Sequence, residues 1–238
     1  MSEMTTTERT KAVLQTIAEK SKVLYQRAYR ALTFDKSVYS EVKDDPEATI
    51  PSALMPFLIE IAFLLIVGIA TIPLWLMYGS GAQIQGNITP AQWAAGIGIA
   101  ISASVVFFFG TYVVWVLSQF LIARFAGVKE IEIMQVLRSS ALAFVPLFFA
   151  PFVVVATMYV AVAGADIAAV VITLIGGGAI FVLVAINTII AFREITGVTS
   201  GVSIMSNVFA LVLASILGTV MAVTYGFTLA GIAWLAMA

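Results

Sequence analysis

The stretch that decides the fold is IMSNVFALVLASILGTVMAVTYGFTLAGIAWLA, residues 204–236. It carries no charged residue, and it exceeds the ~20 apolar residues that cross ~30 Å of hydrocarbon as a helix. It therefore predicts a transmembrane helix that tilts, extends past the membrane or breaks.

Four further apolar runs precede it, at about residues 52–77, 92–123, 139–163 and 167–192. The chain of 238 residues is 61% hydrophobic, and its mean hydropathy is +1.06. Soluble domains are roughly 45–50% apolar. We therefore expect an all-α polytopic membrane protein, a bundle of five transmembrane helices over residues 49–238.

The twelve Lys and Arg residues are distributed unevenly, and eight of them precede residue 44. The other four are Arg124, Lys129, Arg138 and Arg193. Because basic residues concentrate in cytoplasmic loops, this distribution predicts a cytoplasmic N-terminus and an external C-terminus.

Residues 1–48 form a polar segment that contains a predicted amphipathic helix. Apolar or small residues recur there at three- or four-residue spacing from Leu14 to Leu32, with Lys20, Lys22, Arg27 and Arg30 on the flanks. A basic amphipathic helix lies on an anionic cytoplasmic leaflet. The alternative is a helix that packs on the protein's own loops, and the pattern leaves both open.

Composition excludes several classes of function. The net charge is −1, with no extended basic face for phosphates, so we expect no nucleic-acid partner. The chain has no histidine and no cysteine, which removes common metal ligands, bases and nucleophiles. No phosphate loop or dinucleotide motif is present. We expect no enzyme activity, no metal and no cofactor.

Small residues recur every four positions in the fifth apolar run and let two helix backbones approach closely. The candidate helix-packing residues are Ser206, Ala210, Ala214, Gly218, Ala222 and Gly226, and the series continues to Ala230. A shorter series lies in the second run, at Gly96, Ala100 and Ser104. The pattern does not say whether the neighbouring helix belongs to this chain or to another.

Two features within the runs allow a transport function. Glu60 is an ionisable residue well inside the first run, and such a residue is by default a functional hypothesis. The alternative for Glu60 is a structural role, paired with an arginine or protonated. Gly176-Gly177-Gly178 lies in the middle of the fourth run and predicts a kink, a close helix crossing or a broken helix. Because no internal repeat accompanies it, we favour the close crossing.

Three stretches of the chain together resemble a known family. They are RALTFDKSVYSEVKDDPEATIPSAL at 30–54, FAGVKEIEIMQVLRSSALAFVPLF at 125–148 and FREITGVTSGVSIMSNVFALVL at 192–213. The family that they resemble is the Yip family, the Ypt/Rab-interacting-protein domain, in its bacterial and archaeal branch. The resemblance covers about residues 30–225. It implies a non-enzymatic protein of the prokaryotic cytoplasmic membrane, and it carries over no catalytic residue.

Two main functional hypotheses follow. The first is a non-catalytic membrane scaffold or accessory subunit. It binds other integral membrane proteins through the small-residue faces of the second and fifth spans, and lipid headgroups through the basic N-terminal helix. A hetero-complex is expected, and a homo-oligomer is the alternative. The second is a carrier or channel for a small solute or proton that uses Glu60 and a break at Gly176–Gly178. A membrane-shaping protein is a third possibility.

Overall fold

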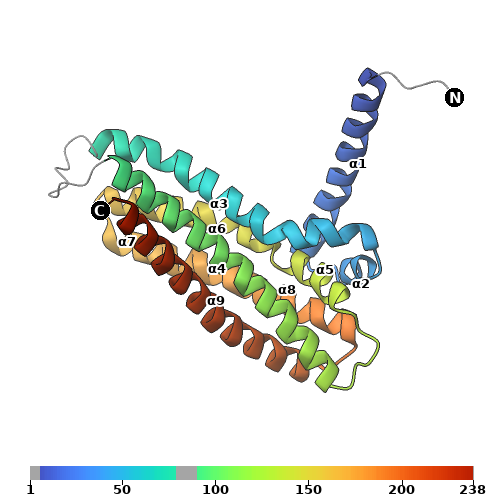
Figure 1. Ribbon diagram of the computed structural model, residues 1–238. Coiled ribbons are helices and arrows are strands. Elements are labelled where there is room, and N and C mark those ends of the chain that lie inside the picture. Colours follow the sequence, from blue (N-terminus) through green and yellow to red (C-terminus); the bar gives the residue numbers. More distant parts are fainter. Residues whose placement is uncertain (1–5, 79–89, 238) are drawn as a thin grey trace.

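The computed structural model describes residues 6–78 and 90–237, except for some side chains near the ends of these ranges and those of Ala100 and Ala222. Every regular element in this part of the chain is helical (Figure 1). The longer helices are α1 (Thr6–Leu32), α3 (Thr49–Tyr78), α4 (Pro90–Phe125), α8 (Gly178–Thr196) and α9 (Ser200–Met237). The shorter ones are α2 (Ser37–Lys43), η1 (Pro46–Ala48), α5 (Ile133–Ala143), η2 (Val145–Phe149), α6 (Ala150–Val162), α7 (Asp166–Ile172) and η3 (Thr173–Gly177).

Five helical segments in the described ranges are long and apolar enough to cross a membrane. They are Pro46–Leu74, Ile101–Phe125, Ile133–Val162, Asp166–Thr196 and Ser200–Leu229. The predicted all-α class with five spans is therefore confirmed. The two longest runs do not break, because α4 and α9 each continue as one helix.

The third span bends where proline interrupts the backbone bonding of an α-helix. Pro146 lies within η2, a 3-10 turn that joins α5 to α6, and Pro151 lies in the first turn of α6. A proline in a first turn removes no helical hydrogen bond.

The buried core lies at one end of the bundle, which we call the charged end because α2, η1, α5 and the basic loops gather there. Val38 and Tyr39 of α2 are completely buried in the same core as Val136 of α5 and Phe192 of α8. Residues before Thr49 thus share one core with the spans. Arg138 reinforces the junction, because its Nη1 donates to the Lys43 carbonyl at 2.8 Å and its Nε donates to Thr49 Oγ1 at 2.7 Å.

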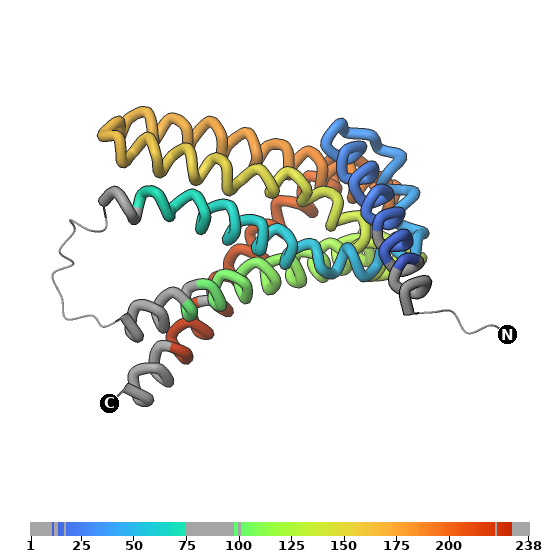
Figure 2. Tube along the Cα trace, turned by 90° about the horizontal axis from the view of Figure 1, so that it is seen from above, coloured from blue at the N-terminus to red at the C-terminus, as the bar shows by residue number. Residues whose placement is uncertain are grey.

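The spans form two layers with α3 between them. Figure 2 shows α6, α7 and α8 on one side of α3, and the antiparallel pair α4 and α9 on the other. The α4–α9 contact is the most extensive between any two helices of the described chain. Away from the charged end, α4 and α9 diverge from α3 (Figure 2), and the described residues of α3 beyond Glu60 are all exposed or half-buried.

Helix α1 crosses the charged end steeply instead of running along the bundle, and its N-terminal half extends past the side of the bundle (Figures 1 and 2). Its C-terminal turns are anchored, since Ala31 is completely buried and Ala28 and Leu32 pack on the core. The chain then reverses at Phe34, which adopts φ 59°. This geometry places α1 across the direction in which the spans run.

Candidate functional site

The small-residue series of α9 faces α4 of the same chain. Ser206, Ala210 and Ala214 are buried, and both alanines pack with Trp115 of α4. The absence of large side chains allows the two helices to approach closely over a long distance.

One glycine of the series lies where a side chain would have no room. A Cβ at Gly218 would overlap the Oγ1 of Thr111 and lie 3.4 Å from the Phe107 carbonyl oxygen. A Cβ at Gly226 would lie 3.8 Å from the Ala103 Cβ, an ordinary contact. Gly96, Ala100 and Ala222 belong to these two helices, but their surroundings lie outside the description.

This geometry removes the described part of the α9 face from the surfaces that we expected to bind other membrane proteins. The described part of the α9 series is covered by α4, so it is not a free docking surface in this structure. Helical spacing shows that a face is narrow, but it does not identify the helix that covers the face. A partner would therefore have to use another surface.

Glu60 lies between α3 and α4 and is only 2% exposed. The hydroxyl of Ser104 donates to Glu60 Oε1 at 2.5 Å, so this serine of the shorter series has a polar role as well. Glu60 Oε2 has no hydrogen-bond partner among the described residues. In the same residues, no group of three or more His, Cys, Asp or Glu side chains could hold a metal ion.

The glycine triplet produces a wide turn in a continuous span. Thr173–Gly177 form one π-helical turn, and Gly178 begins α8 without interruption, so the helix is not broken there. A Cβ at Gly176 would lie 2.8 and 2.9 Å from the two Cγ atoms of Val153, whereas Gly177 and Gly178 have open space around them. Of the three glycines, only Gly176 lies at a close helix crossing, which it makes with α6.

A buried polar network links three helices, and sequence spacing did not reveal it. Gln119 Nε2 donates to Asn207 Oδ1 at 2.9 Å, and Ser140 Oγ donates to Gln119 Oε1 at 3.1 Å. Asn207 Nδ2 in turn donates to the Ser203 carbonyl at 2.8 Å. Buried amides that satisfy one another in this way fix the relative positions of α4, α5 and α9.

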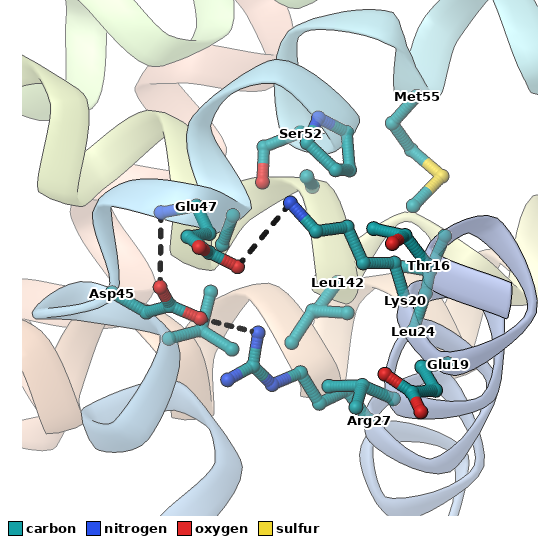
Figure 3. Close-up of a pocket in the computed structure, with 15 residues that line it drawn as sticks. Thr16, Glu19, Lys20, Leu24, Arg27, Asp45, Glu47, Ser52, Met55 and Leu142 are labelled. Atoms are coloured by element: carbon teal, nitrogen blue, oxygen red, sulfur yellow. Dashed lines mark hydrogen bonds and ion pairs between the residues drawn. The ribbon is translucent and has the colours of Figure 1, made fainter. Parts of the chain in front are cut away.

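A pocket of about 300 Å³ lies where α1 leaves the bundle, between α1, η1, α3 and α5. Figure 3 shows charged side chains around the pocket, and apolar side chains, including Met55 and Leu142, among them. Lys20 Nζ lies 3.5 Å from Glu47 Oε2, and Arg27 Nη1 lies 2.7 Å from Asp45 Oδ2 (Figure 3).

These contacts belong to an ion-pair network that fastens α1. Arg27 also pairs with Glu41 at 3.0 Å, and Arg30 pairs with both Glu41 and Asp35 at 2.7 Å. The hydrogen bond from Ser37 and the one from Arg30 lower the pKa of Asp35 to about 2. Hydrogen bonds from Arg30 and Arg27 lower the pKa of Glu41 against the effect of burial.

Asp45 completes this network. Burial opposes ionisation of Asp45, but the hydrogen bonds from Arg27 and from the Glu47 amide outweigh it, so its pKa is lowered. Three of the four basic residues assigned from sequence to the helix flanks, Lys20, Arg27 and Arg30, are thus paired with acids of the same chain. The C-terminal half of α1 packs on the protein's own loops, and we call this set of ion pairs the ionic latch of α1.

Comparison with protein-family models, with curated proteins and with solved structures found no match to this chain. The resemblance to the Yip family therefore stays a prediction. Fold and composition define the class: an all-α, multi-pass membrane protein with five apolar spans.

Proposed function

We propose that the chain is a non-catalytic, Yip-like integral membrane scaffold or accessory subunit that binds membrane lipid and other integral membrane proteins. Its location is the cytoplasmic membrane of a prokaryotic cell, with the N-terminus inside and the C-terminus outside. The orientation rests on the Lys and Arg distribution. A hetero-complex is the expected assembly, with a homo-oligomer as the alternative.

The observation that carries the proposal is the outer face of α1, which we define by Leu14, Tyr25 and Tyr29. These side chains are 59%, 72% and 58% exposed. Leu14 and Tyr25 are three helical turns apart and Tyr29 is one turn further, so the three share a face. Exposed Lys11 and Lys22 lie on the same side of the helix.

The outer face has the chemistry of a helix that binds at a membrane surface. Aromatic and aliphatic side chains enter the boundary between headgroups and acyl chains, and flanking lysines attract anionic lipid. The ion pairs of Arg27 and Arg30 hold the C-terminal part of α1 on the bundle. The N-terminal part of α1, which we call the arm, extends outward from there. An arm of this kind joins the bundle to a neighbouring protein or to the lipid surface around it.

The decisive experiment isolates the full chain from its native membrane in mild detergent and identifies the proteins that accompany it. Tyr25→Glu places a charge on the outer face, whereas Gln26→Glu adds the same charge about 100° further round the helix. We expect a stoichiometric partner to be lost with Tyr25→Glu and retained with Gln26→Glu. A parent chain that carries no partner, or a partner equally bound by both variants, contradicts the proposal.

Glu60 supports a second candidate, a carrier or channel for a proton or small solute. A carboxyl group inside a span costs at least ~2.5 kcal/mol on insertion scales, and Glu60 Oε2 has no partner in the described chain. Glu60→Gln retains the shape and removes the ionisable carboxyl group. If the parent chain conducts in proteoliposomes, Glu60→Gln abolishes the flux; an inactive parent or an unchanged variant rejects this candidate.

A further inference from the structure

The carboxyl group of Glu60 lies at the middle of the first span. Glu60 is the central residue of the segment Pro46–Leu74, and it is only 2% exposed. Of the described residues, only Ser104 of α4 forms a hydrogen bond with this carboxyl group. An ionisable group at this depth in a span is by default a functional hypothesis.

The helices around Glu60 bring no charge that pairs with it. The elements packed against α3 are η1, α4, α5, η2 and α6. Their charged residues and tyrosines in the described ranges are Glu47, Tyr112, Arg124, Arg138 and Tyr159. Arg138 donates to Lys43 and Thr49, and both tyrosines donate to backbone carbonyls. The charge of Glu60 is therefore not neutralised by an ion pair within the described chain.

The hydroxyl of Ser104 lies between two oxygen atoms that could accept its proton. Its Oγ is 2.5 Å from Glu60 Oε1 and 2.8 Å from the Ile101 carbonyl oxygen. A serine hydroxyl has one proton, so it donates fully to one of these oxygens at a time, and its lone pairs accept from another donor. Both contacts are full hydrogen bonds together only when Glu60 itself supplies a proton.

Two hydrogen-bond arrangements thus fit the same positions of the heavy atoms. When Glu60 is a carboxylate, Ser104 donates to Oε1. When Oε1 takes up a proton, the carboxyl group donates to Ser104 Oγ, and Ser104 turns its own proton to the Ile101 carbonyl. The change consists of one proton added to Oε1 and the rotation of one hydroxyl hydrogen. The site therefore gains or loses a proton without a rearrangement of the helices.

The second oxygen of Glu60 explains why proton uptake relieves the site. In the carboxylate form, Oε2 carries part of a buried charge and has no hydrogen-bond partner in the described chain, which is costly. A proton on Oε1 removes the charge and leaves Oε2 as a neutral carbonyl oxygen. A proton on Oε2 would instead be a buried donor without an acceptor, which costs free energy. Oε1 is therefore the atom that takes up the proton.

The same oxygen atoms suit a proton better than a metal cation. Hard cations such as Ca²⁺ and Mg²⁺ take about six or more oxygen ligands. The described residues offer only the carboxyl group of Glu60, the Ser104 hydroxyl and the Ile101 carbonyl, and no cluster of acids joins them in that part of the chain. A proton needs one oxygen and one hydrogen-bond acceptor, and both are present.

We propose that Glu60 and Ser104 form a proton-binding site at the middle of the first span. Oε1 of Glu60 takes up and releases one proton, and the Ser104 hydroxyl accommodates both forms by turning between Glu60 and the Ile101 carbonyl. The inference rests on the carrier candidate for its biological use and narrows the cargo of that candidate to the proton. Proton binding does not require transport, so the two can fail separately.

Infrared difference spectroscopy of the full chain in phosphatidylcholine vesicles tests the site. A neutral carboxyl group has a C=O stretching band that a carboxylate lacks, and Glu60→Gln identifies the band of Glu60. We expect the band to appear on acidification and to vanish on alkalinisation, within the pH range in which circular dichroism shows intact helices. Ser104→Ala removes the acceptor of the carboxyl proton and shifts the band to higher frequency.

Ser102→Ala is the matched control on the same helix. The hydroxyl of Ser102 bonds to the Gly98 and Ile99 carbonyls at 2.9 and 3.0 Å, so its loss should leave the band in place. The shift in Ser104→Ala keeps the test valid if Glu60→Gln misfolds. The proposal is overturned if no band belongs to Glu60, if the band does not change with pH, or if Ser104→Ala and Ser102→Ala give the same band position.

Flux through proteoliposomes separates this proposal from the carrier candidate. If the parent chain conducts, we expect it to conduct protons and not Na⁺ or K⁺, and Glu60→Gln to abolish the proton flux. A band that responds to pH in a chain without flux supports the proton site and rejects the carrier candidate. A flux of Na⁺ or K⁺ at constant pH that Glu60→Gln abolishes overturns the assignment of the proton as the cargo.

Discussion

Gly218 of α9 lies directly against the side chain of Thr111 of α4, close enough that a Cβ on Gly218 would overlap the threonine hydroxyl. Among the described glycines, Gly218 leaves the least room for an added Cβ. Thr111 Oγ1 has no hydrogen-bond partner in the described chain. The contact with Gly218 is therefore a packing contact without a hydrogen bond.

Gly218→Ala should therefore destabilise the bundle by about 1–3 kcal/mol, the usual cost of overpacking. Thermal unfolding in detergent measures this change. Gly226→Ala is the matched control on the same helix, because its new Cβ has room. Thr111→Ala should restore most of the stability lost in Gly218→Ala; a double variant as unstable as the single one shows that the clash lies elsewhere.

The glycine triplet allows a second prediction, which compares three Gly→Ala variants within one span. Gly176→Ala pushes a methyl group into Val153, whose branched side chain has little rotamer freedom, so we expect a loss of about 1–3 kcal/mol. Gly177→Ala and Gly178→Ala meet open space and should be neutral or stabilising by up to ~1 kcal/mol. Equal effects at all three positions would show that backbone flexibility, not the α6 crossing, is what the triplet provides.

The spans were predictable because a long, continuous apolar run is compatible with few structures other than a transmembrane helix. Residues 204–236 and 92–123 correspond to single long helices, and the prolines of the third run correspond to η2 and the start of α6. Their number and approximate positions follow from composition alone, although the third span begins at Ile133 and not at 139, and the fourth ends at Thr196 and not at 192.

The contacts between helices could not be predicted from the sequence in the same way. The spacing of Ala210 and Ala214 describes one face of one helix, so it could not identify α4 as the cover. The pairing of Arg27 with Asp45 depends on the reversal at Phe34, a φ above zero that a bulky residue rarely adopts. Gln119 and Asn207 are 88 positions apart, and nothing local links them.

The buried amide network yields a third prediction. Asn207→Ala leaves the Gln119 amide without its acceptor, and an unsatisfied buried donor costs about 1–3 kcal/mol. Asn207→Leu combined with Gln119→Leu removes both groups and should recover part of that loss. A double-mutant cycle on unfolding free energies measures the coupling. Zero coupling between the two positions would contradict the network.

The ionic latch of α1 yields a prediction with a defined pH range. The pKa values of Asp35, Glu41 and Asp45 are all lowered in the folded chain. A lowered pKa means that the carboxylate stabilises the fold above its unfolded pKa, and that this stability is lost as the pH falls through the folded pKa. For Asp35 the loss extends from its ordinary value of 3.8 down to about 2. Acidification should therefore release α1 from the bundle.

Because the chain contains no cysteine, two introduced cysteines carry the only spin labels. Ser21→Cys on α1 and Met134→Cys on α5 are both exposed sites, and their label distance reports the docking of α1. We expect a narrow distance distribution at neutral pH that broadens between about pH 4 and pH 2.

Arg27→Gln, which removes two of the ion pairs, should broaden the distance distribution at neutral pH, and high salt should have a similar but smaller effect. Gln26→Glu is the control for a change of charge beside the latch. A distribution that stays narrow at low pH and in Arg27→Gln would show that the apolar contacts of Ala28, Ala31 and Leu32 hold α1 without help from the charges.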